Sequence, residues 1–281
     1  MNSRIDAITL GVADLHRARE FYEDGLGFPV EQERGGSVTH ALGAGPSKLV
    51  LCPWDSLAGD AGLSPESSGF RGFTLSYIVE EAHQVDEVLA RAVRSGGDLS
   101  KPPRNAMWGY SAYVTAPDGC LWKIASSKRR PLIGRNRRAG SSEGDAKREI
   151  ALTVGVADMK RARQFYKDGL GCPVKKDYSK FVSFGGDDGT PDLAMYTWDA
   201  LAADAGVPAT GSGFRGFSIT HVVDSADDVD AELGKAARAG GRIVREPSES
   251  SGQPSGYYTD TDGYLWKIAS SAQAARVAMP G

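Results

Sequence analysis

Two lysine side chains are the candidates for chemistry in this sequence. Lys123 and Lys267 are each the third residue of a Leu-Trp-Lys-Ile segment, and the side chains of a strand alternate between its two faces. A partly buried ammonium group can bind an anionic or carbonyl oxygen, and because burial lowers the pKa of a lysine, it can also act as a base or a Schiff-base nucleophile. The alternative is that both lysines reach solvent or pair with a nearby carboxylate.

Tyr113 and Tyr257 are the candidate acid–base partners of these lysines. The sequence lacks the signatures of other chemistries: it has no Gly-x-Gly-x-x-Gly opening a helix after a strand, no Walker-type loop, no Gly-x-Ser-x-Gly elbow joining a strand to a helix and no His-Glu-x-x-His. Its cysteines occupy unmatched positions of a long internal repeat. This argues against a disulfide framework or a thiolate metal site.

The internal repeat spans most of the chain. Residues 4–127 recur at 148–271, with every position displaced by 144 and no insertion or deletion. A period this long indicates two full domains in tandem and not an array of small units. The sequence therefore predicts four segments: a domain at 1–127, a basic Gly/Ser-rich linker at 128–147, a second domain at 148–271 and a tail at 272–281.

Each copy is expected to contain the same series of elements twice. Asp14 is placed to cap a helix whose end falls near Gly25, a residue suited to a left-handed cap. Apolar periodicity in the first copy predicts strands near 8–12, 28–30, 38–42, 49–52, 73–79, 99, 112–115 and 121–126, and helices near 15–22 and 85–93. Between the two series, the repeated Trp-Asp to Asp-Ala-Gly segment predicts a short helix of structural role. Each copy is thus βαβββ twice over, which predicts an α+β fold.

Short motifs accompany these elements: Val-Ala-Asp-Leu at 12–15, Phe-Tyr at 21–22, Gly-Leu-Gly at 25–27 and Pro-Asp-Gly at 117–119. In this order they resemble the vicinal oxygen chelate superfamily of glyoxalases, bleomycin-resistance proteins and extradiol dioxygenases. The resemblance covers both copies. It implies that paired βαβββ modules curl their mixed sheets into cups, with helices on the convex face and the ligand in the concavity. Whether the modules pair within a copy or across copies stays open.

Strand periodicity predicts which side chains face a cup. The face that carries Ile8, Leu10 and Val12 is apolar and must be covered by helices, so the alternate residues face the concavity. If each copy forms its own cup, Lys123 lies beside Thr9 and Thr74, and Lys267 lies beside Thr153 and Ser218. The predicted cup residues are Ala7, Thr9, Thr74, Ser76, Leu121 and Lys123 in one copy and Ala151, Thr153, Ser218, Thr220, Leu265 and Lys267 in the other.

The cups are expected to hold no metal ion and no other cofactor. The resemblance implies a histidine at the start of the first strand of each module and a carboxylate on the last strand. The matching positions hold Ala7, Thr74, Ala151 and Ser218 for the histidines and Lys123 or Lys267 for the final carboxylate. An ammonium group in a ligand position repels a divalent ion. His221 falls on the helix-facing side of its strand, where it is expected to be a core residue.

Aromatic residues complete the expected ligand sites. Trp54 and Trp198 are candidate pocket walls, and Trp108 and Tyr110 form a candidate lid on the first cup. The second copy has small polar residues at the lid position, so the two cups should accept different ligands. The full set of candidate ligand-binding residues is Thr9, Trp54, Thr74, Ser76, Trp108, Tyr110, Lys123, Thr153, Trp198, Ser218, Thr220 and Lys267.

Two functions follow from this pattern. The favoured one is metal-independent binding, or sequestration, of a small organic molecule in the cups. The alternative is a metal-free lyase, isomerase or cyclase that acts on a carbonyl-containing substrate through a lysine and Tyr113 or Tyr257. A further possibility is that one copy has lost its function and only supports the other.

The expected partner is a small-molecule ligand, and a homodimer is possible. The net charge is −3, which makes nucleic acid an unlikely partner. The one basic run, at 128–138, is interpreted as a solvated linker. No membrane interaction is expected, since the start of the chain is not an apolar signal and no apolar stretch is long enough to span a bilayer. The expected location is cytoplasmic.

Overall fold

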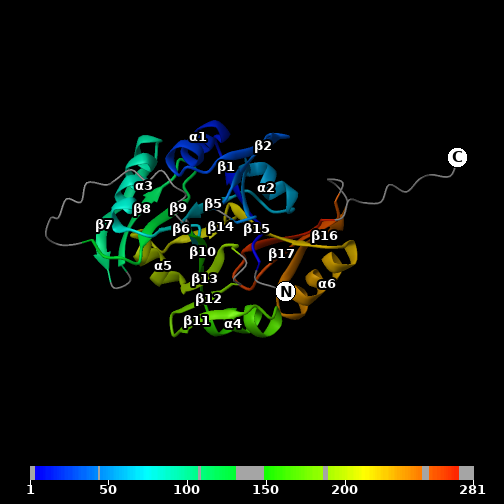
Figure 1. Cartoon of the computed structure of the whole chain (residues 1–281). Helices are drawn as coiled ribbons and strands as arrows, with labels where there is room; N and C mark the ends of the chain where they lie inside the picture. Colours follow the sequence, from blue (N-terminus) through cyan, green and yellow to red (C-terminus); the bar gives the residue numbers. More distant parts are fainter. Residues whose placement is uncertain are drawn as a thin grey trace.

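The computed structural model describes residues 4–43, 45–106, 109–130, 149–185, 189–248 and 253–271 (Figure 1). The elements of the first copy are β1 (Ala7–Val12), α1 (Leu15–Glu20), η1 (Phe21–Gly25), β2 (Val30–Arg34), β3 (Ser37–Ala41), β4 (Lys48–Pro53), α2 (Trp54–Asp60), β5 (Ser67–Gly69), β6 (Phe73–Val79), α3 (Ala82–Arg94), β7 (Asp98–Ala106), β8 (Gly109–Thr115) and β9 (Leu121–Ser126). Those of the second copy are β10 (Glu149–Val156), α4 (Met159–Arg163), η2 (Gln164–Gly169), β11 (Val174–Tyr178), β12 (Phe181–Phe184), β13 (Asp192–Thr197), α5 (Trp198–Ala205), β14 (Gly211–Gly213), β15 (Phe217–Val223), α6 (Ala226–Arg238), β16 (Arg242–Ser248), β17 (Ser255–Thr259) and β18 (Leu265–Ser270). The predicted βαβββ series, twice in each copy, is confirmed.

The first helix begins as predicted and ends differently. The Asp14 carboxylate accepts a hydrogen bond of 3.1 Å from the backbone amide of Arg17, which satisfies a donor that the first helical turn leaves without a partner. The expected left-handed cap at Gly25 is wrong: Gly25 lies inside the π-helical turn η1, and the glycine with a positive φ, of 72°, is Gly27. Gly25 allows close packing instead, since a Cβ there would lie 3.1 Å from the Cβ of Ser95.

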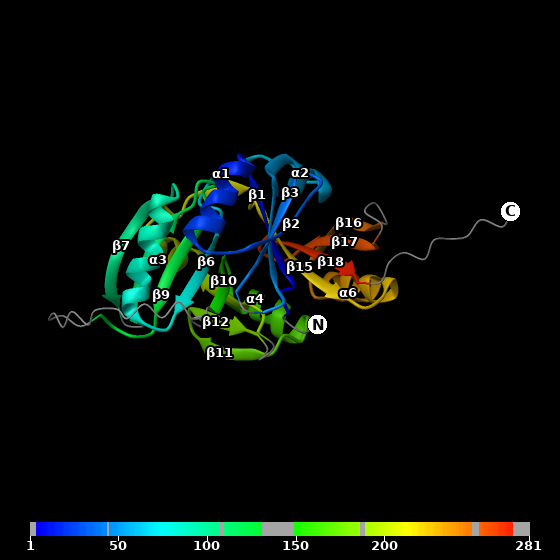
Figure 2. The same ribbon diagram turned by 45° about the horizontal axis from the view of Figure 1, so that its top comes forward.

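Two eight-stranded mixed sheets carry the fold, with the strand orders β16-β17-β18-β15-β1-β4-β3-β2 and β11-β12-β13-β10-β6-β9-β8-β7. At the centre of each sheet two strands pair in antiparallel fashion, β15 with β1 and β10 with β6, and we name the sheets after these pairs: the β15/β1 sheet and the β10/β6 sheet. Both sheets can be followed in Figure 1 and Figure 2. Each sheet joins the first module of one copy to the second module of the other. The modules therefore pair across the copies, which decides the question that the sequence leaves open.

The apolar core also runs through both copies. It packs the convex faces of the sheets against helices: α1 and α6 contact strands of the β15/β1 sheet, and α3 and α4 contact strands of the β10/β6 sheet. Trp122 and Trp266, on the last strand of each copy, are among the largest fully buried side chains of this single core. The two copies therefore do not bury separate cores, because both sheets and the core take residues from both copies.

The short helices α2 and α5 lie on the concave faces. Leu57 and Ala58 of α2 pack against Tyr257 and Leu265 of the β15/β1 sheet. A Cβ on Gly11, which shares a face with the cup residue Thr9, would lie 3.1 Å from the first residue of α2. α5 packs in the same way on the β10/β6 sheet. These helices thus join the two halves of a copy, as expected, and also contribute side chains to the cups.

Most of the expected linker, from 131 onward, and the expected tail at 272–281 lie outside the described residues. Among the helices in the described part of the chain, none has both the length and the apolar character needed to cross a lipid bilayer.

Cleavage between the copies is expected to leave one particle. We would insert the recognition sequence of a site-specific protease between residues 131 and 148 and cut the folded protein. Both sheets need strands from both halves, so the halves should elute together in gel filtration and separate only in denaturant. Two half-sized species under native conditions would contradict the pairing of β1 with β15 and of β10 with β6.

Candidate functional site

The concave face of the β10/β6 sheet carries one group of the predicted residues, and we call it the Lys123 cup. Thr74 lies opposite Thr153, and Ser76 lies opposite Ala151, across the β6–β10 pair. Ser76 is also the neighbour of Lys123 across the β6–β9 pair. Thr74 and Ser76 are buried residues of this concave face, at the floor of the cup.

The concave face of the β15/β1 sheet forms the Lys267 cup. Thr9 lies opposite Ser218 across the β1–β15 pair, and Thr220 is the neighbour of Lys267 on β18. Strand periodicity therefore predicts the faces correctly. The predicted neighbours are wrong in one respect: Thr9 shares a cup with Lys267, and Thr153 shares a cup with Lys123, because the modules pair across copies.

A carboxylate from the other copy enters the Lys123 cup. Asp204, at the end of α5, places its Oδ2 atom 2.6 Å from Lys123 Nζ and 2.5 Å from the Tyr113 hydroxyl, which donates a hydrogen bond to it. Lys101 Nζ donates to the backbone carbonyl of Asp204, and the Tyr113 ring lies 5.5 Å from Lys123 Nζ. The prediction that the lysine pairs with a nearby carboxylate is confirmed for Lys123.

The electrostatics of this cluster follow from its contacts. Burial raises the pKa of Asp204, but the Lys123 ammonium and the hydrogen bonds from Lys123 and Tyr113 outweigh it and hold the pKa below the ordinary value. Burial is also the main cause that raises the pKa of Tyr113, and the Asp204 carboxylate raises it further. Asp204 is therefore an anion that holds Tyr113 in its protonated, donating form.

The Lys267 cup has equivalents of the four clustered residues, and they are arranged differently. The equivalents of Lys123, Tyr113, Asp204 and Lys101 are Lys267, Tyr257, Asp60 and Arg245. The Lys267 ammonium lies 5.4 Å from the centre of the Tyr257 ring and, among the described residues, makes no hydrogen bond or ion pair. Asp60, the counterpart of Asp204, is exposed at the end of α2, and Arg245, the counterpart of Lys101, donates to its backbone carbonyl. Burial is the main cause that lowers the pKa of Lys267. A half-buried ammonium without a paired carboxylate distinguishes this cup.

Cys52 marks a second difference between the cups. It occupies the position of Tyr196, which stands beside the apolar cluster of the Lys123 cup. Cys52 is half-buried near Lys267, and burial raises the pKa of its thiol to about 11. The thiol is therefore protonated at neutral pH, and its small side chain leaves the Lys267 cup without the ring that Tyr196 provides.

The sequence reasoning missed four residues of these clusters. Asp60 and Asp204 were expected to have only a structural role in the short helix, and Lys101 and Arg245 were not considered. The sequence does contain an indication: Asp60 and Asp204 are equivalent acidic positions, and Lys101 and Arg245 are equivalent basic positions. It could not reveal the clusters, because the acidic residue and the lysine of one cluster belong to different copies and meet only in the tertiary structure.

The aromatic candidates are divided between the apolar clusters of the cups and the helix-facing side of a sheet. The Trp54 and Trp198 indoles donate to the backbone carbonyls of Pro65 and Ala209, and their rings join the apolar clusters beneath α2 and α5. Tyr110 is on the helix-facing side of β8, where its hydroxyl donates to Asp86 of α3 at 2.8 Å, so it does not cover the Lys123 cup. Trp108 lies outside the described residues.

The cup residues do not fit the metal that the resemblance implies. Within the described ranges, no three His, Cys, Asp or Glu side chains are grouped so that they could hold a metal ion. The strand positions of the concave faces offer hydroxyls and an ammonium, a poor set of ligands for a divalent ion, and the Asp204 carboxylate in the Lys123 cup is paired with that ammonium. His221 is buried on the helix-facing side, as expected, with Nδ1 at 3.3 Å from Asp6 Oδ2.

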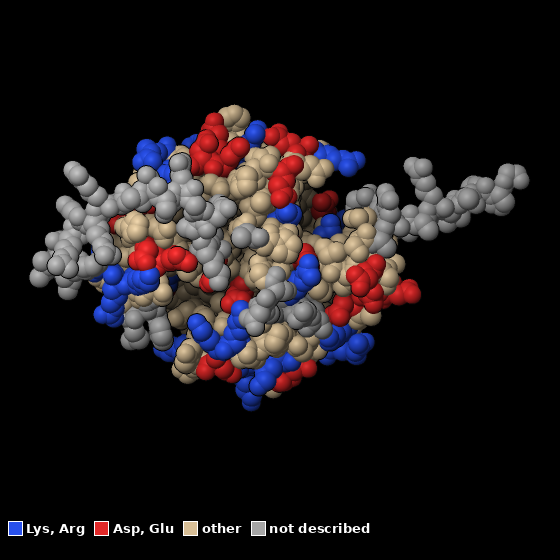
Figure 3. All heavy atoms as spheres, in the orientation of Figure 1, with Lys and Arg blue, Asp and Glu red and all other residues tan. Residues whose placement is uncertain are grey.

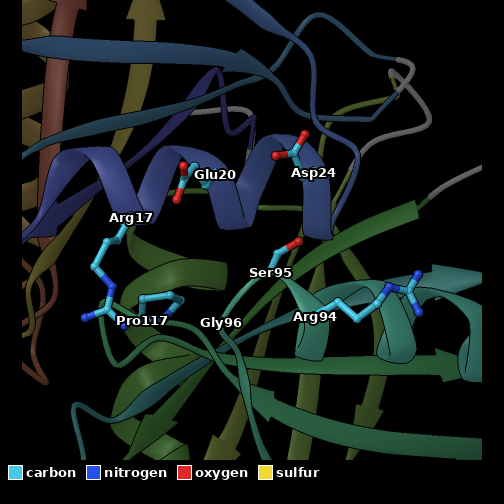
Figure 4. A pocket seen from close by; sticks show the side chains of 7 residues that line it. All are labelled: Arg17, Glu20, Asp24, Arg94, Ser95, Gly96 and Pro117. Carbon is cyan, nitrogen blue, oxygen red and sulfur yellow. The ribbon is translucent and has the colours of Figure 1, made fainter.

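A groove of about 350 Å³ lies on the helical side of the molecule, away from both lysines. Figure 4 shows it between α1 with η1 and the end of α3, with Arg17, Glu20, Asp24, Arg94, Ser95, Gly96 and Pro117 as its lining. Its charges are of both signs, as they are over the whole face seen in Figure 3. The groove therefore has no preference for one sign of charge, and we assign no ligand to it.

Comparison with known proteins agrees with this architecture. The sequence profile of the Glyoxalase/Bleomycin resistance protein/Dioxygenase superfamily matches residues 4–124 and again residues 150–268, one match in each copy. Among curated proteins, no sequence matches the chain.

Among the solved structures that are similar over nearly the whole chain are two from different organisms. The crystal structure of glyoxalase I from Zea mays has a TM-score of 0.62 and 18% identity, covering 95% of this chain and 92% of that chain. The crystal structure of a putative dioxygenase from Bacillus subtilis subsp. subtilis str. 168 has a TM-score of 0.62 and 15% identity, covering 96% of this chain and 85% of that chain. At these identities the similarity concerns the fold alone.

Proposed function

This chain belongs to the Glyoxalase/Bleomycin resistance protein/Dioxygenase superfamily, and we propose that it is a small-molecule binding protein whose concave cups hold an organic ligand without a metal ion. The observation that carries the proposal is the donor pair in each cup. Lys123 with Tyr113, and Lys267 with Tyr257, stand beside hydroxyls and apolar side chains on a rigid sheet. A few polar groups in an apolar concavity are what a small-molecule site needs.

Metal independence is part of the proposal. Its support is chemical: in each cup a lysine stands where a carboxylate ligand would be needed, and the neighbouring strand positions are hydroxylic or apolar. Purified protein dialysed against Ni²⁺, Zn²⁺, Mn²⁺ or Fe²⁺ should retain no stoichiometric metal in elemental analysis. One equivalent per copy that survives dialysis would contradict this part of the proposal.

A second function has one observation in its favour. Burial lowers the pKa of Lys267 beside the Tyr257 hydroxyl, and a lysine with a lowered pKa is a better base and nucleophile at neutral pH. The alternative is therefore a metal-free lyase, isomerase or cyclase acting on a carbonyl compound, with Lys267 as base and Tyr257 as acid. A ligand recovered unchanged after long incubation supports binding, whereas its conversion supports catalysis.

The test of the proposed function begins with the intact protein. Native mass spectrometry should detect organic compounds that co-purify with it, and a chemically diverse library should contain compounds that raise its melting temperature. Replacement of cup residues should weaken binding of such compounds. If no compound binds, or if binding is indifferent to every cup residue, the proposed function is wrong.

A further inference from the structure

The Lys123 cup already contains a carboxylate, and the protein itself supplies it. The Oδ2 atom of Asp204 lies 2.6 Å from Lys123 Nζ and 2.5 Å from the Tyr113 hydroxyl, so one oxygen accepts from both donors. Charge-assisted hydrogen bonds of this kind are those by which proteins bind carboxylate ligands. Asp204 thus takes the place that a ligand carboxylate would take in this cup.

The Lys267 cup presents the same two donors without that acceptor. The distance from the lysine Nζ to the tyrosine ring centre is 5.4 Å for Lys267 and Tyr257, against 5.5 Å for Lys123 and Tyr113. The donor pair is therefore similarly placed in both cups. In the part of the chain that the structure describes, neither Lys267 Nζ nor the Tyr257 hydroxyl has a hydrogen-bond partner.

The ends of the two short helices explain the difference. α5 runs through Asp204 to Ala205 and is capped by Gly206 with a left-handed φ of 77°, which keeps Asp204 inside the helix and directed at Lys123. α2 is shorter and ends at Asp60 itself. The Asp60 side chain remains near enough to act on Lys267 electrostatically, yet it is exposed and makes no ion pair with it.

The shape and charge of the Lys267 cup favour an anion with a compact body. The smaller side chain of Cys52 stands where the other cup has Tyr196. Arg245 lies close enough to Lys267 to act on it as a second positive charge. Even half-buried, an ammonium that lacks a paired anion loses part of its hydration, and a bound carboxylate would offset that loss.

We propose that the Lys267 cup binds the carboxylate group of a small organic acid, and that Asp204 closes the Lys123 cup to such ligands. This rests on the proposed function and adds the class of the ligand and the cup that holds it. The carboxylate would accept from Lys267 and Tyr257 as Asp204 does from Lys123 and Tyr113. The apolar body would lie against Cys52 and Leu265, in the cluster beneath α2.

The first experiment is a fluorine NMR titration of the full-length protein with para-fluorobenzoate and its neutral analogue para-fluorobenzamide. We expect one saturable benzoate site per chain and much weaker binding of the amide. Lys267→Met should weaken benzoate binding by about 10- to 150-fold, the effect of losing one charge-assisted hydrogen bond. Lys160→Met, which removes the same charge from the exposed helix α4, is the matched control and should leave the affinity unchanged.

The second experiment opens the other cup. Asp204→Ala frees Lys123 and Tyr113, so the number of benzoate sites should rise from one to two per chain. Adding Lys123→Met to Asp204→Ala should abolish the new site, and Asp199→Ala, an exposed change in the first turn of the same helix, should keep one site. If Asp204→Ala does not fold, Asp204→Ser keeps a polar side chain that is too short to reach both donors, and the same comparison applies.

The outcomes separate this inference from the proposed function. Equal affinity for the acid and the amide, indifference to Lys267→Met, or an unchanged number of sites in the folded Asp204 variant would overturn the inference. So would the absence of benzoate binding in a protein that binds neutral library compounds in a cup, a result that would leave the proposed function standing. If no compound of any class binds, both are wrong.

Discussion

A Gly72→Ala variant is expected to be destabilised by roughly 2 to 5 kcal/mol, the combined cost of a left-handed residue and of overpacking. Gly72 has a φ of 82°, and an added Cβ would lie 2.6 Å from the Tyr264 hydroxyl and 2.7 Å from Cη2 of Trp198. Both neighbours belong to the second copy. The Tyr264 hydroxyl is hydrogen-bonded to the Gly72 carbonyl at 2.7 Å, so the added methyl group would disturb the contact between the copies.

Chemical denaturation followed by circular dichroism measures this loss, and Gly119→Ala is its matched control. Gly119 has a φ of 80°, and a Cβ there would meet nothing within 4 Å. The control should therefore lose only the backbone contribution, about 1 to 2 kcal/mol. If the two variants lose the same amount, close packing at Gly72 is not what requires a glycine.

An Asp260→Asn variant is expected to gain stability over the native protein as the pH rises. Burial raises the pKa of Asp260 from 3.8 to about 6, against the lowering effect of hydrogen bonds from Tyr166 and from the amides of Tyr264 and Asp262. Because the pKa is higher in the folded state, the native protein binds the extra proton between about pH 4 and pH 6. Its free energy of unfolding therefore falls through this window. The asparagine variant lacks this titration.

The difference in unfolding free energy, variant minus native, should rise by roughly 2 to 3 kcal/mol between about pH 4 and pH 7.5. Taking the difference cancels the titration of groups that both proteins share. Tyr166→Phe is a second test: it removes the hydroxyl that donates to Asp260 at 2.5 Å, so the pKa of Asp260 in the folded state should rise and the window should extend to higher pH. A difference that does not depend on pH would show that Asp260 titrates normally.

The two cups of the duplicated chain differ in few residues. Their lysines and tyrosines are equivalent, and the hydroxyls on their floors differ little. What separates them is the placement of the carboxylate at the end of each short helix, the exchange of cysteine for tyrosine and the exchange of arginine for lysine. These differences accompany an ammonium that is paired with a carboxylate in one cup and not in the other, which is the basis of the further inference.

The sequence by itself determined the repeat, the order of the elements and the face on which each strand residue lies. These are local properties: side chains alternate along a strand, and an apolar face must be covered wherever the strand is placed. For this reason Thr9, Thr74, Ser218 and Lys267 were assigned to concave faces correctly. The resemblance to a known family rested on similarly local motifs.

Only the tertiary structure decided which strands meet. Thr74 and Ser218 occupy equivalent positions, so pairing Thr9 with either one gives nearly the same apolar faces and the same backbone hydrogen bonds. With the local energies so similar, the packing of the whole chain makes the choice. The partner of Lys123 followed from that choice, because Asp204 belongs to the other copy and reaches the lysine only when modules pair across copies.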